Sequence, residues 1–371
     1  MKYYILAGEA SGDLHGANLM KALFKEDPEA DIRFWGGDLM QNVGGTLVTH
    51  YKERAIMGFV EVLLNLKKAL NFIKSCKKDI AKYNPDVIIF IDNSGFNLRI
   101  AKWAKKNNFK TNYYISPQVW ASRPGRVESI KRDIDNMFVI LPFEKDFYSK
   151  FNYTVNFVGH PLIDGIEGRK QVDEHEFRKK HHLGSKKIIA LLPGSRKQEI
   201  SKMLSVMLSL TDDFSNYQFV VAGAPSQSYE FYKEFIKNKN VSFISNKTYD
   251  LLSISYAALV TSGTATLEAA LFKVPQVVCY KGSNIEYQIA KRIITLDYIS
   301  LVNLIMNKEV VTELIQNDFT KEKLKQELFR ILDSTHREQL FLDYFDLEKV
   351  LGGKGASEKT AKLIVDGLKN D

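Results

Sequence analysis

Short apolar runs alternate with longer amphipathic stretches along nearly the whole chain. The runs in the first half are KYYILA, IRFWGG, DVIIFID, TNYYIS and NMFVILP, and those in the second half are KIIALLPGS, YQFVVAGAP, VSFIS, AALVTSG and PQVVCYKG. Runs of this length are typical of buried parallel strands. The stretches between them, such as residues 16–27 and 97–108, have apolar residues at helical spacing. The alternation predicts an α/β fold of doubly wound parallel sheets with right-handed crossovers.

The strand–helix pattern pauses near the middle of the chain. Residues 157–187 are rich in glycine and charge, and the pattern resumes after them. A length of 371 residues also exceeds one typical core. We therefore predict two Rossmann-like domains, residues 1–165 and 166–345, that face a cleft. Residues 346–371 are predicted to form a C-terminal helical segment that packs back on an N-terminal domain, of the same chain or of a partner.

Charge and composition narrow the class of protein. The net charge of +8 indicates an anionic partner, which could be nucleic acid, acidic lipid headgroups or a phosphorylated substrate. Zinc-finger spacing and RNA-binding aromatic motifs are absent, so we expect no nucleic acid partner. The chain has only two cysteines, no signal peptide and no apolar run long enough to span a bilayer. These features predict a cytoplasmic protein.

The segment AGEASGDLHGA, residues 7–17, follows the first predicted strand. Its glycines and the polar residues between them are Gly8, Gly12, Gly16, Glu9, Ser11 and Asp13. We predict a loop in which the glycines let the backbone approach a ligand and the polar side chains contact it. An ordinary glycine-rich turn is the alternative. The segment matches neither GxGxxG nor the Walker A motif, which disfavours a dinucleotide oxidoreductase.

Asp92 directly follows the apolar run of another predicted strand, in FIDNSGFN. Ligands of open parallel sheets bind at the carboxyl ends of strands. A carboxylate at that place can accept a proton as a general base, or it can cap the next helix, which is the commoner use. Both interpretations are compatible with the sequence.

The second half has two segments typical of helix starts that bind anions. LLPGSRKQEI contains Gly194, Ser195 and Arg196, and VTSGTATLEAAL contains Ser262, Gly263, Thr264 and Glu268. Free amides and the helix dipole stabilise an anion there, and an arginine adds a forked donor for phosphate. Glu268 is suited to a ribose diol, although a plain cap followed by a solvated glutamate is the alternative. Together the segments predict a nucleotide-sugar donor.

We expect no metal. The DID sequence at Asp133 to Asp135 matches a short pattern that arises easily by chance, and it lies where a helix runs into a strand. The adjacent His181 and His182 cannot readily share one tetrahedral site. A departing diphosphate would instead be stabilised by Arg196, lysines and helix N-termini.

Residues 56–82 form a long amphipathic stretch with a basic side. Its lysines include Lys67, Lys68, Lys74, Lys77, Lys78 and Lys82. Such a helix can lie in a membrane interface, where lysines meet anionic headgroups. A helix that packs on the core and keeps its lysines in solvent is the alternative.

Taken in order, these motifs resemble one family over nearly the whole chain. They are AGEASGDLHGA, IMGFVEVL, DVIIFIDNSGFNLR, YYISPQVWASRPGRV, LPFEKDFY, FVGHPLID, LLPGSRKQEI, SGTATLEAAL and YISLVNLI. The chain resembles lipid-A-disaccharide synthase, an inverting GT-B glycosyltransferase. The resemblance implies that UDP-2,3-diacylglucosamine is joined to 2,3-diacylglucosamine 1-phosphate, giving a β-1,6-linked acylated disaccharide 1-phosphate and UDP.

The resemblance also implies partners and residue roles. It implies peripheral association with the inner membrane, no metal or other cofactor and, in some members, a homodimer that exchanges C-terminal segments. Asp92 matches the essential aspartate and general base. Arg196, Glu268 and Asn303 match residues around UDP, and Ser11 matches a position near the donor phosphates.

The chain departs from the family pattern at a few positions. Gly95 replaces a second acid that many relatives have three residues after the essential one, and Ser94 replaces a proline. Asp92 is therefore the only acid of its motif. Val302 replaces a common proline, and ASR after Trp120 replaces the frequent AWR. These changes bear on acyl-chain preference and leave the reaction class as it is.

Two other functions fit parts of the sequence. Another GT-B transferase with a lipid-linked acceptor, such as a muropeptide N-acetylglucosaminyltransferase, shares the two-domain plan. A lipid-binding or scaffold protein could use the basic amphipathic side without turnover, although the set of polar loops argues against it.

Overall fold

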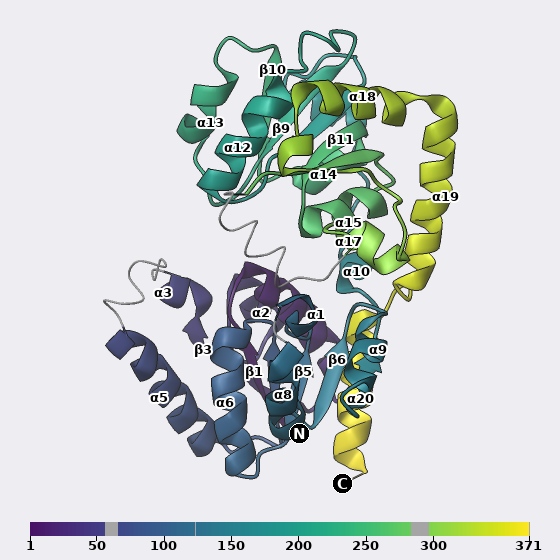
Figure 1. Cartoon of the computed structure of the whole chain (residues 1–371). Coiled ribbons are helices and arrows are strands. Elements are labelled where there is room, and N and C mark those ends of the chain that lie inside the picture. Colours follow the sequence, from purple (N-terminus) through teal and green to yellow (C-terminus); the bar gives the residue numbers. More distant parts are fainter. Residues whose placement is uncertain (56–65, 123, 283–296, 371) are drawn as a thin grey trace. The chain divides into compact units, whose positions relative to one another are not determined.

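The chain divides into two compact units. The computed structural model describes residues 1–55, 66–122, 124–282 and 297–370. The first unit comprises Met1–Asp164 and Leu351–Asp371, and the second comprises Gly165–Val350. Each unit contains one parallel sheet with helices on both faces (Figure 1). The predicted doubly wound α/β architecture is therefore confirmed for both halves of the chain.

The sheet of the first unit has the strand order β3-β2-β1-β4-β5-β6-β7. Its strands are β1 (Lys2–Ala7), β2 (Asp31–Gly36), β3 (Thr46–His50), β4 (Val87–Ile91), β5 (Thr111–Tyr114), β6 (Asn136–Val139) and β7 (Asn156–Phe157). The first predicted strand matches β1, the run IRFWGG overlaps β2 in all but the strand's first residue, and the other runs contain β4, β5 and β6. The edge strands β3 and β7 were not predicted, because short and half-buried strands have no continuous apolar run.

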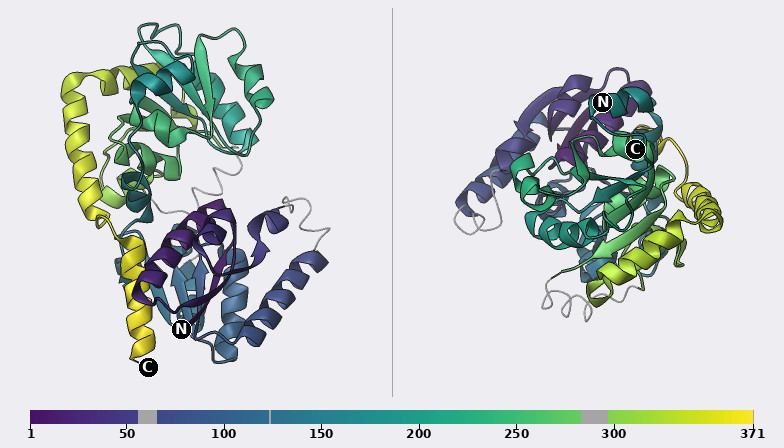
Figure 2. Two further views of the ribbon diagram at one scale, coloured as in Figure 1. Left: turned by 180° about the vertical axis from the view of Figure 1, so that it is seen from behind. Right: turned by 90° about the horizontal axis from the view of Figure 1, so that it is seen from above.

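Helices cover both faces of this sheet, because alternate strand residues point to opposite sides. In β4, Ile88 and Phe90 pack in one cluster and Ile89 and Ile91 in another. The first cluster includes residues of α5 (Leu66–Tyr83), α6 (Ser94–Lys106) and α8 (Val127–Asp133). The second includes residues of α1 (Ala10–Glu26), α2 (Asp38–Val43) and α20 (Ala356–Lys369). Figure 2 shows α20 alongside α1, so the last helix is part of the first unit.

Shorter helices complete the first unit. They are α3 (Tyr51–Ala55), α7 (Val119–Ser122), η1 (Pro124–Arg126), α9 (Glu144–Ser149) and α10 (Pro161–Glu167), the last of which crosses into the second unit. Two hydrogen bonds connect the segment that precedes α20 to the segment around α10. His160 N donates to Leu351 O at 3.1 Å, and Gly355 N donates to the Asp164 carboxylate at 2.7 Å. These bonds join the two points where the chain leaves and re-enters the first unit.

The sheet of the second unit has the order β10-β9-β8-β11-β12-β13. Its strands are β8 (Ile188–Leu192), β9 (Gln218–Gly223), β10 (Val241–Ser245), β11 (Ser255–Thr261), β12 (Gln276–Tyr280) and β13 (Glu313–Ile315). The helices are α11 (Glu174–Lys180), α12 (Lys197–Leu208), α13 (Tyr229–Ile236), α14 (Thr248–Ser253), α15 (Thr264–Leu271), α17 (Leu301–Met306), η2 (Gln316–Asp318), α18 (Lys321–Leu332) and α19 (Ser334–Val350). All five predicted strands of this half are present.

The glycine-rich segment after β1 is not the loop that its composition predicts. Helix α1 begins at Ala10 and includes Gly12 and Gly16. A Cβ at Gly16 would lie 2.5 Å from the sulfur of Met40, and one at Gly12 would lie 3.3 Å from the Cβ of Ala7. A side chain at Gly16 would require Met40 to move, and one at Gly12 would be in tight contact with Ala7, so close packing against the sheet and α2 favours glycine despite its low helix propensity.

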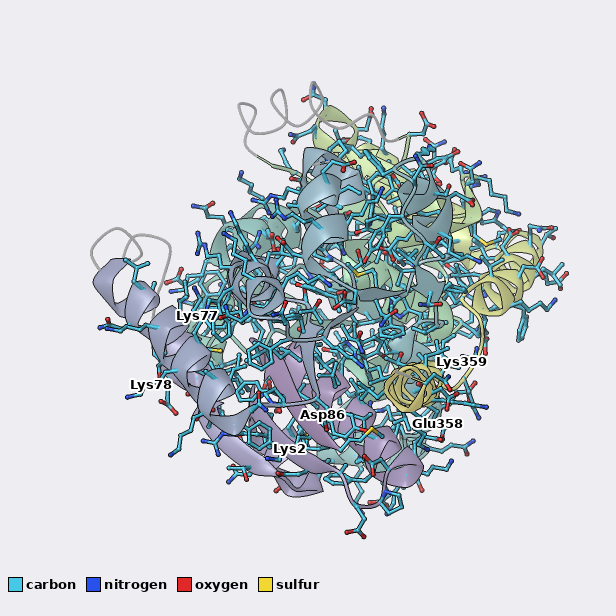
Figure 3. The ribbon with its side chains drawn as sticks, turned by 90° about the horizontal axis from the view of Figure 1, so that it is seen from below. Lys2, Lys77, Lys78, Asp86, Glu358 and Lys359 are labelled. Atoms are coloured by element: carbon cyan, nitrogen blue, oxygen red, sulfur yellow. The ribbon has the colours of Figure 1, made fainter. Side chains whose placement is uncertain are left out.

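No helix in the described part of the chain combines the length and apolarity that a bilayer crossing requires. Of the amphipathic stretch, residues 56–65 lie outside the described residues. The rest forms α5, which packs Cys76 and Ile80 into the core. Lys77 and Lys78 lie on this helix (Figure 3), and Leu70 is 57% exposed.

Candidate functional site

Asp92 lies at a sharp turn between β4 and α6. Its φ is 44° and that of Asn93 is 45°, so two consecutive residues adopt the left-handed conformation, which is strained for both. The Asp92 carbonyl accepts hydrogen bonds from Asn97 Nδ2, at 2.8 Å, and from the hydroxyl of Tyr113. Asn97 is buried and also donates to Ile91 O at 3.2 Å. These two side chains hold the turn, and the sequence analysis missed both.

Asp92 is an exposed residue at the carboxyl edge of the sheet. The surrounding protein atoms still limit its hydration and raise its pKa above the ordinary aspartate value, although the Asn93 amide opposes the shift. The N-cap of α6 is Asn93, so Asp92 stands one residue before the cap. Asp92 is therefore not the N-cap residue of α6.

A cavity of about 530 Å³ lies next to this turn. Its polar lining residues are Glu9, Asn93 and Arg99, and its apolar ones include Tyr51, Ala69, Phe72, Ile73 and Phe96. Gly8 also lines it, and a Cβ there would lie 1.9 Å from Asn93 Nδ2, so the glycine is required for the close approach of the two turns. Glu9 is the predicted polar contact that this cavity includes.

Asp13, a predicted substrate contact, forms hydrogen bonds within the first unit. It is 3% exposed, and its carboxylate accepts hydrogen bonds from Gly37 N (2.8 Å), Leu39 N (3.0 Å) and Met40 N (3.0 Å). These are the free amides at the start of α2. Gly12 is likewise buried against β1. Ser11 is exposed in the first turn of α1 and does not line the cavity.

A second pocket, of about 310 Å³, lies at the carboxyl edge of the other sheet. It brings together most of the predicted donor-binding residues. They are Gly194, Ser195, Arg196, Ser262, Gly263, Thr264 and Glu268, from the β8–α12 and β11–α15 junctions. Gly194 has a φ of +105° and Gly263 a φ of +150°, conformations that favour glycine. Two helix N-termini thus open onto one pocket, which is an arrangement suited to a diphosphate.

The amides at the first of these helix starts already hold an anion. Ser195 N and Arg196 N each donate to Glu199 Oε2 at 3.3 Å, and the Arg196 guanidinium lies 3.4 Å from Oε1. The sequence analysis predicted free amides here and missed Glu199. A glutamate at the third position of a helix is a known sequence signal for such back-bonding. The Arg196 side chain itself is 84% exposed and therefore accessible to a ligand.

Glu268 lies inside this pocket and is not a solvated surface residue. Burial raises its pKa, and Tyr249 donates a hydrogen bond to it at 2.9 Å. Ser262 Oγ donates to Ile299 O at 2.9 Å, which fixes the second helix start. Tyr249 has no local sequence signal, because its contact comes from the neighbouring helix α14.

Asn303, which was predicted to lie near UDP, is not among the residues that line this pocket. It is fully buried, donates to Val311 O at 2.8 Å and accepts from Val310 N at 2.8 Å. It also donates to Glu313 at 2.9 Å, and Glu313 accepts from Ile299 N at 2.9 Å. The Ile299 carbonyl in turn accepts the hydrogen bond from Ser262 Oγ. Asn303 is therefore connected to the start of α15 through Glu313 and Ile299.

Both aspartates of the DID sequence interact with neighbouring residues of the first unit. Asp133 pairs with Arg132 at 2.6 Å, and Asp135 accepts from Thr111 N at 2.9 Å. Both lie before β6, at the amino edge of the sheet. Among the described residues, no three His, Cys, Asp or Glu side chains are grouped so that they could hold a metal.

Comparison with known proteins places this fold and these motifs in one family. Residues 3–363 match the family model described as lipid-A-disaccharide synthetase. The lipid-A-disaccharide synthase of Syntrophus aciditrophicus is 39% identical over 98% of this chain and 97% of its own length. The Geobacter metallireducens enzyme of that name is 37% identical over 98% of this chain and 96% of its own length. A lipid-A-disaccharide synthase of Coxiella burnetii is 35% identical over 97% of this chain and 96% of its own length.

Solved structures share the architecture at low sequence identity. UDP-GlcNAc 2-epimerase from Neisseria meningitidis, bound to UDP-GlcNAc, has a TM-score of 0.66 at 12% identity and covers 100% of both chains. The Methanocaldococcus jannaschii UDP-GlcNAc 2-epimerase has a TM-score of 0.67 at 14% identity, over 99% of this chain and 100% of that one. The two-domain Rossmann-like GT-B fold is therefore confirmed. The chain belongs to the lipid-A-disaccharide synthetase family, and it is an enzyme, a glycosyltransferase.

Proposed function

We propose that this enzyme transfers the diacylglucosamine of UDP-2,3-diacylglucosamine to 2,3-diacylglucosamine 1-phosphate. The products are the β-1,6-linked disaccharide 1-phosphate and UDP. The observation that carries the proposal is the presence of two pockets of different chemistry. One has two helix starts and Arg196. The other is lined by Asn93 and Gly95, at the turn that carries Asp92, and the pKa of Asp92 is raised.

In the proposed reaction, Asp92 accepts the proton of the acceptor 6-hydroxyl as that oxygen attacks the anomeric carbon of the donor. The bond from this carbon to the diphosphate breaks on the opposite side, which inverts the configuration. A raised pKa makes Asp92 a stronger base near neutral pH. The transition state has oxocarbenium character, so negative charge develops on the leaving UDP.

The second unit is proposed to hold UDP. Gly194, Ser195 and Arg196 at the start of α12 would stabilise the departing charge. Ser262, Gly263 and Thr264 at the start of α15 would do the same, and Glu268 would bind the ribose hydroxyls. Ser11 would contact the donor phosphates from α1. With these groups in place, the proposed mechanism uses no metal.

The direct test supplies the purified enzyme with both acylated sugars and detects disaccharide and UDP by mass, with and without a chelator. Asp92→Asn should retain UDP binding and lose about 10²–10⁴-fold in rate. Asp86→Asn is the matched control, because Asp86 is an exposed acid at the amino end of the same strand (Figure 3). Near-normal turnover by Asp92→Asn would remove the base from the mechanism.

The same assay separates the rival functions. Disaccharide formation with an acceptor that lacks the acyl chains would favour a different GT-B transferase. Absence of UDP release with both acylated lipids would favour a lipid-binding role. A rate that falls with the chelator would contradict metal independence.

We also propose peripheral binding to the inner membrane surface through α5. Lys74, Lys78 and Lys82 are exposed on this helix, and Leu70 adds an exposed apolar side chain at its beginning. Sedimentation with anionic vesicles should exceed that with neutral vesicles, and a Lys74→Glu/Lys78→Glu variant should lose the difference. Equal sedimentation of this variant and the wild type would contradict the proposal.

A further inference from the structure

The cavity at the turn between β4 and α6 is amphiphilic, with a polar side and an apolar wall. Asn93 and Gly95 place it directly at the turn that carries the proposed base. Ala69, Phe72 and Ile73 on α5 form part of its apolar wall. A volume of about 530 Å³ lies within the range of small-molecule sites.

Arg99 is the only lysine or arginine among the described residues that line this cavity. It lies on α6, in the second turn of the helix, and its side chain is exposed. An arginine guanidinium binds phosphate through two parallel N–H donors, which a single ammonium group does not offer. A forked cation next to an apolar wall fits a ligand that carries both a phosphate and an acyl chain.

We propose that this cavity is the acceptor site and that Arg99 binds the acceptor's phosphate. The acyl chain nearest the sugar lies against Ala69, Phe72 and Ile73. Arg99 thereby makes the enzyme selective for phosphorylated acylated sugars over unphosphorylated ones. This inference rests on the proposed function, since it assigns one of the two substrates to one of the two pockets.

The lining of this cavity matches the acceptor better than the donor. A nucleoside diphosphate carries two phosphates and a ribose diol, and it matches the two helix starts and Glu268 of the second unit. The cavity of the first unit supplies one cation, one carboxylate at Glu9 and an apolar wall. It therefore fits a monophosphorylated amphiphile better than a nucleotide.

The test compares kcat/KM for the 1-phosphorylated acceptor and for the same acylated sugar without phosphate. Arg99→Gln should lower the value for the phosphorylated acceptor about 10–100-fold, mainly through KM. It should leave the value for the unphosphorylated acceptor and the KM of the donor nearly unchanged. Arg99→Lys should restore part of the loss. Lys106→Gln, which removes a charge from the exposed end of the same helix, should behave like the wild type.

A second variant tests the apolar wall. Ile73→Ser should lower kcat/KM for both acylated acceptors together, because both carry the chain that contacts the wall. Melting temperatures of all variants identify any that fail to fold. Unchanged preference for the phosphorylated acceptor in Arg99→Gln, or equal loss with both acceptors, would overturn the assignment. Failure of the wild type to form disaccharide with either acceptor is a separate outcome and would contradict the proposed function itself.

Discussion

Replacing Asn97 with alanine tests whether one buried amide positions the proposed base. Asn97 is 1% exposed, and its Nδ2 lies 2.8 Å from Asp92 O, 3.2 Å from Ile91 O and 3.4 Å from Leu6 O. An amide nitrogen has two hydrogens, so about two of these bonds form at one time. The Asn97→Ala variant leaves the strand ends short of two donors beside two residues in the left-handed conformation.

The magnitude follows from these contacts. Two lost hydrogen bonds cost about 1–3 kcal/mol in total, and each buried carbonyl left without a donor adds to that penalty. Asn97 Oδ1 has no partner itself, so its removal returns part of the cost. Asp92 O keeps the bond from Tyr113. We therefore expect a net loss of about 2 kcal/mol, which a domain of ordinary stability survives.

The catalytic effect should exceed this destabilisation. A displacement of the base by about 1 Å can cost up to about 10²-fold in rate. The assay measures kcat for disaccharide formation at a temperature where denaturation curves show the variant fully folded. Asn136→Ala is the matched control, because it removes one amide bond to Asn112 at the amino edge of the same sheet.

Two results would refute this reasoning. One is an Asn97→Ala enzyme with wild-type kcat, which would mean that the turn needs no clamp. The other is a kcat loss equal to that of Asn136→Ala, which would indicate a general effect on the fold. Tyr113→Phe, which removes the other donor to Asp92 O, should give a smaller change in the same direction.

Three further predictions concern other parts of the chain. Gly8→Ala places a Cβ 1.9 Å from Asn93 Nδ2 and should lower the free energy of unfolding by about 1–3 kcal/mol. Adding Asn93→Gly should restore stability in thermal melts. Additive effects of the two substitutions on stability would contradict the contact. Calorimetry should show that UDP binds about 10-fold more weakly to Arg196→Ala. UDP should bind more tightly to Glu199→Gln, because this substitution removes the carboxylate that occupies the same amides. Weaker UDP binding in both variants would contradict this competition. Burial raises the pKa of Glu144 from 4.5 to about 7, so the folded state binds more protons and its stability falls as pH rises between these values. Relative to Glu144→Gln, the wild type should lose about 3 kcal/mol over that interval in denaturant titrations, and parallel pH profiles would contradict it.

Much of the candidate site could be predicted from local sequence. The PGSR turn and the SGT turn each follow a buried strand and start a helix, so their backbone amides had to lie at a sheet edge. Asp92 was predicted there for the same reason. Glu199 was also within reach of sequence analysis, because its bond to the helix start spans only three or four residues.

Other parts of the site depend on contacts that no local pattern encodes. Glycine spacing after β1 indicated close approach, but not that the neighbours are Asn93 and Met40. Arg99 and Phe72 share a cavity because α5 and α6 are neighbours on one face of the sheet. Tyr113 reaches Asp92 from the next strand, 21 residues away.

The two parallel sheets, their helix connections and the sheet edges that carry the candidate sites could be predicted from the amino-acid sequence, because apolar periodicity and helix-start residues act within a few positions along the chain. Which polar side chains stabilise the fold and which line a pocket depends instead on how the chain packs in three dimensions. Asp13 bonds to amides 24 or more residues away, and Asn303 bonds to the segment before β13. A buried polar group must find a partner wherever the packed chain supplies one, and that choice depends on the three-dimensional arrangement and not on the neighbouring letters.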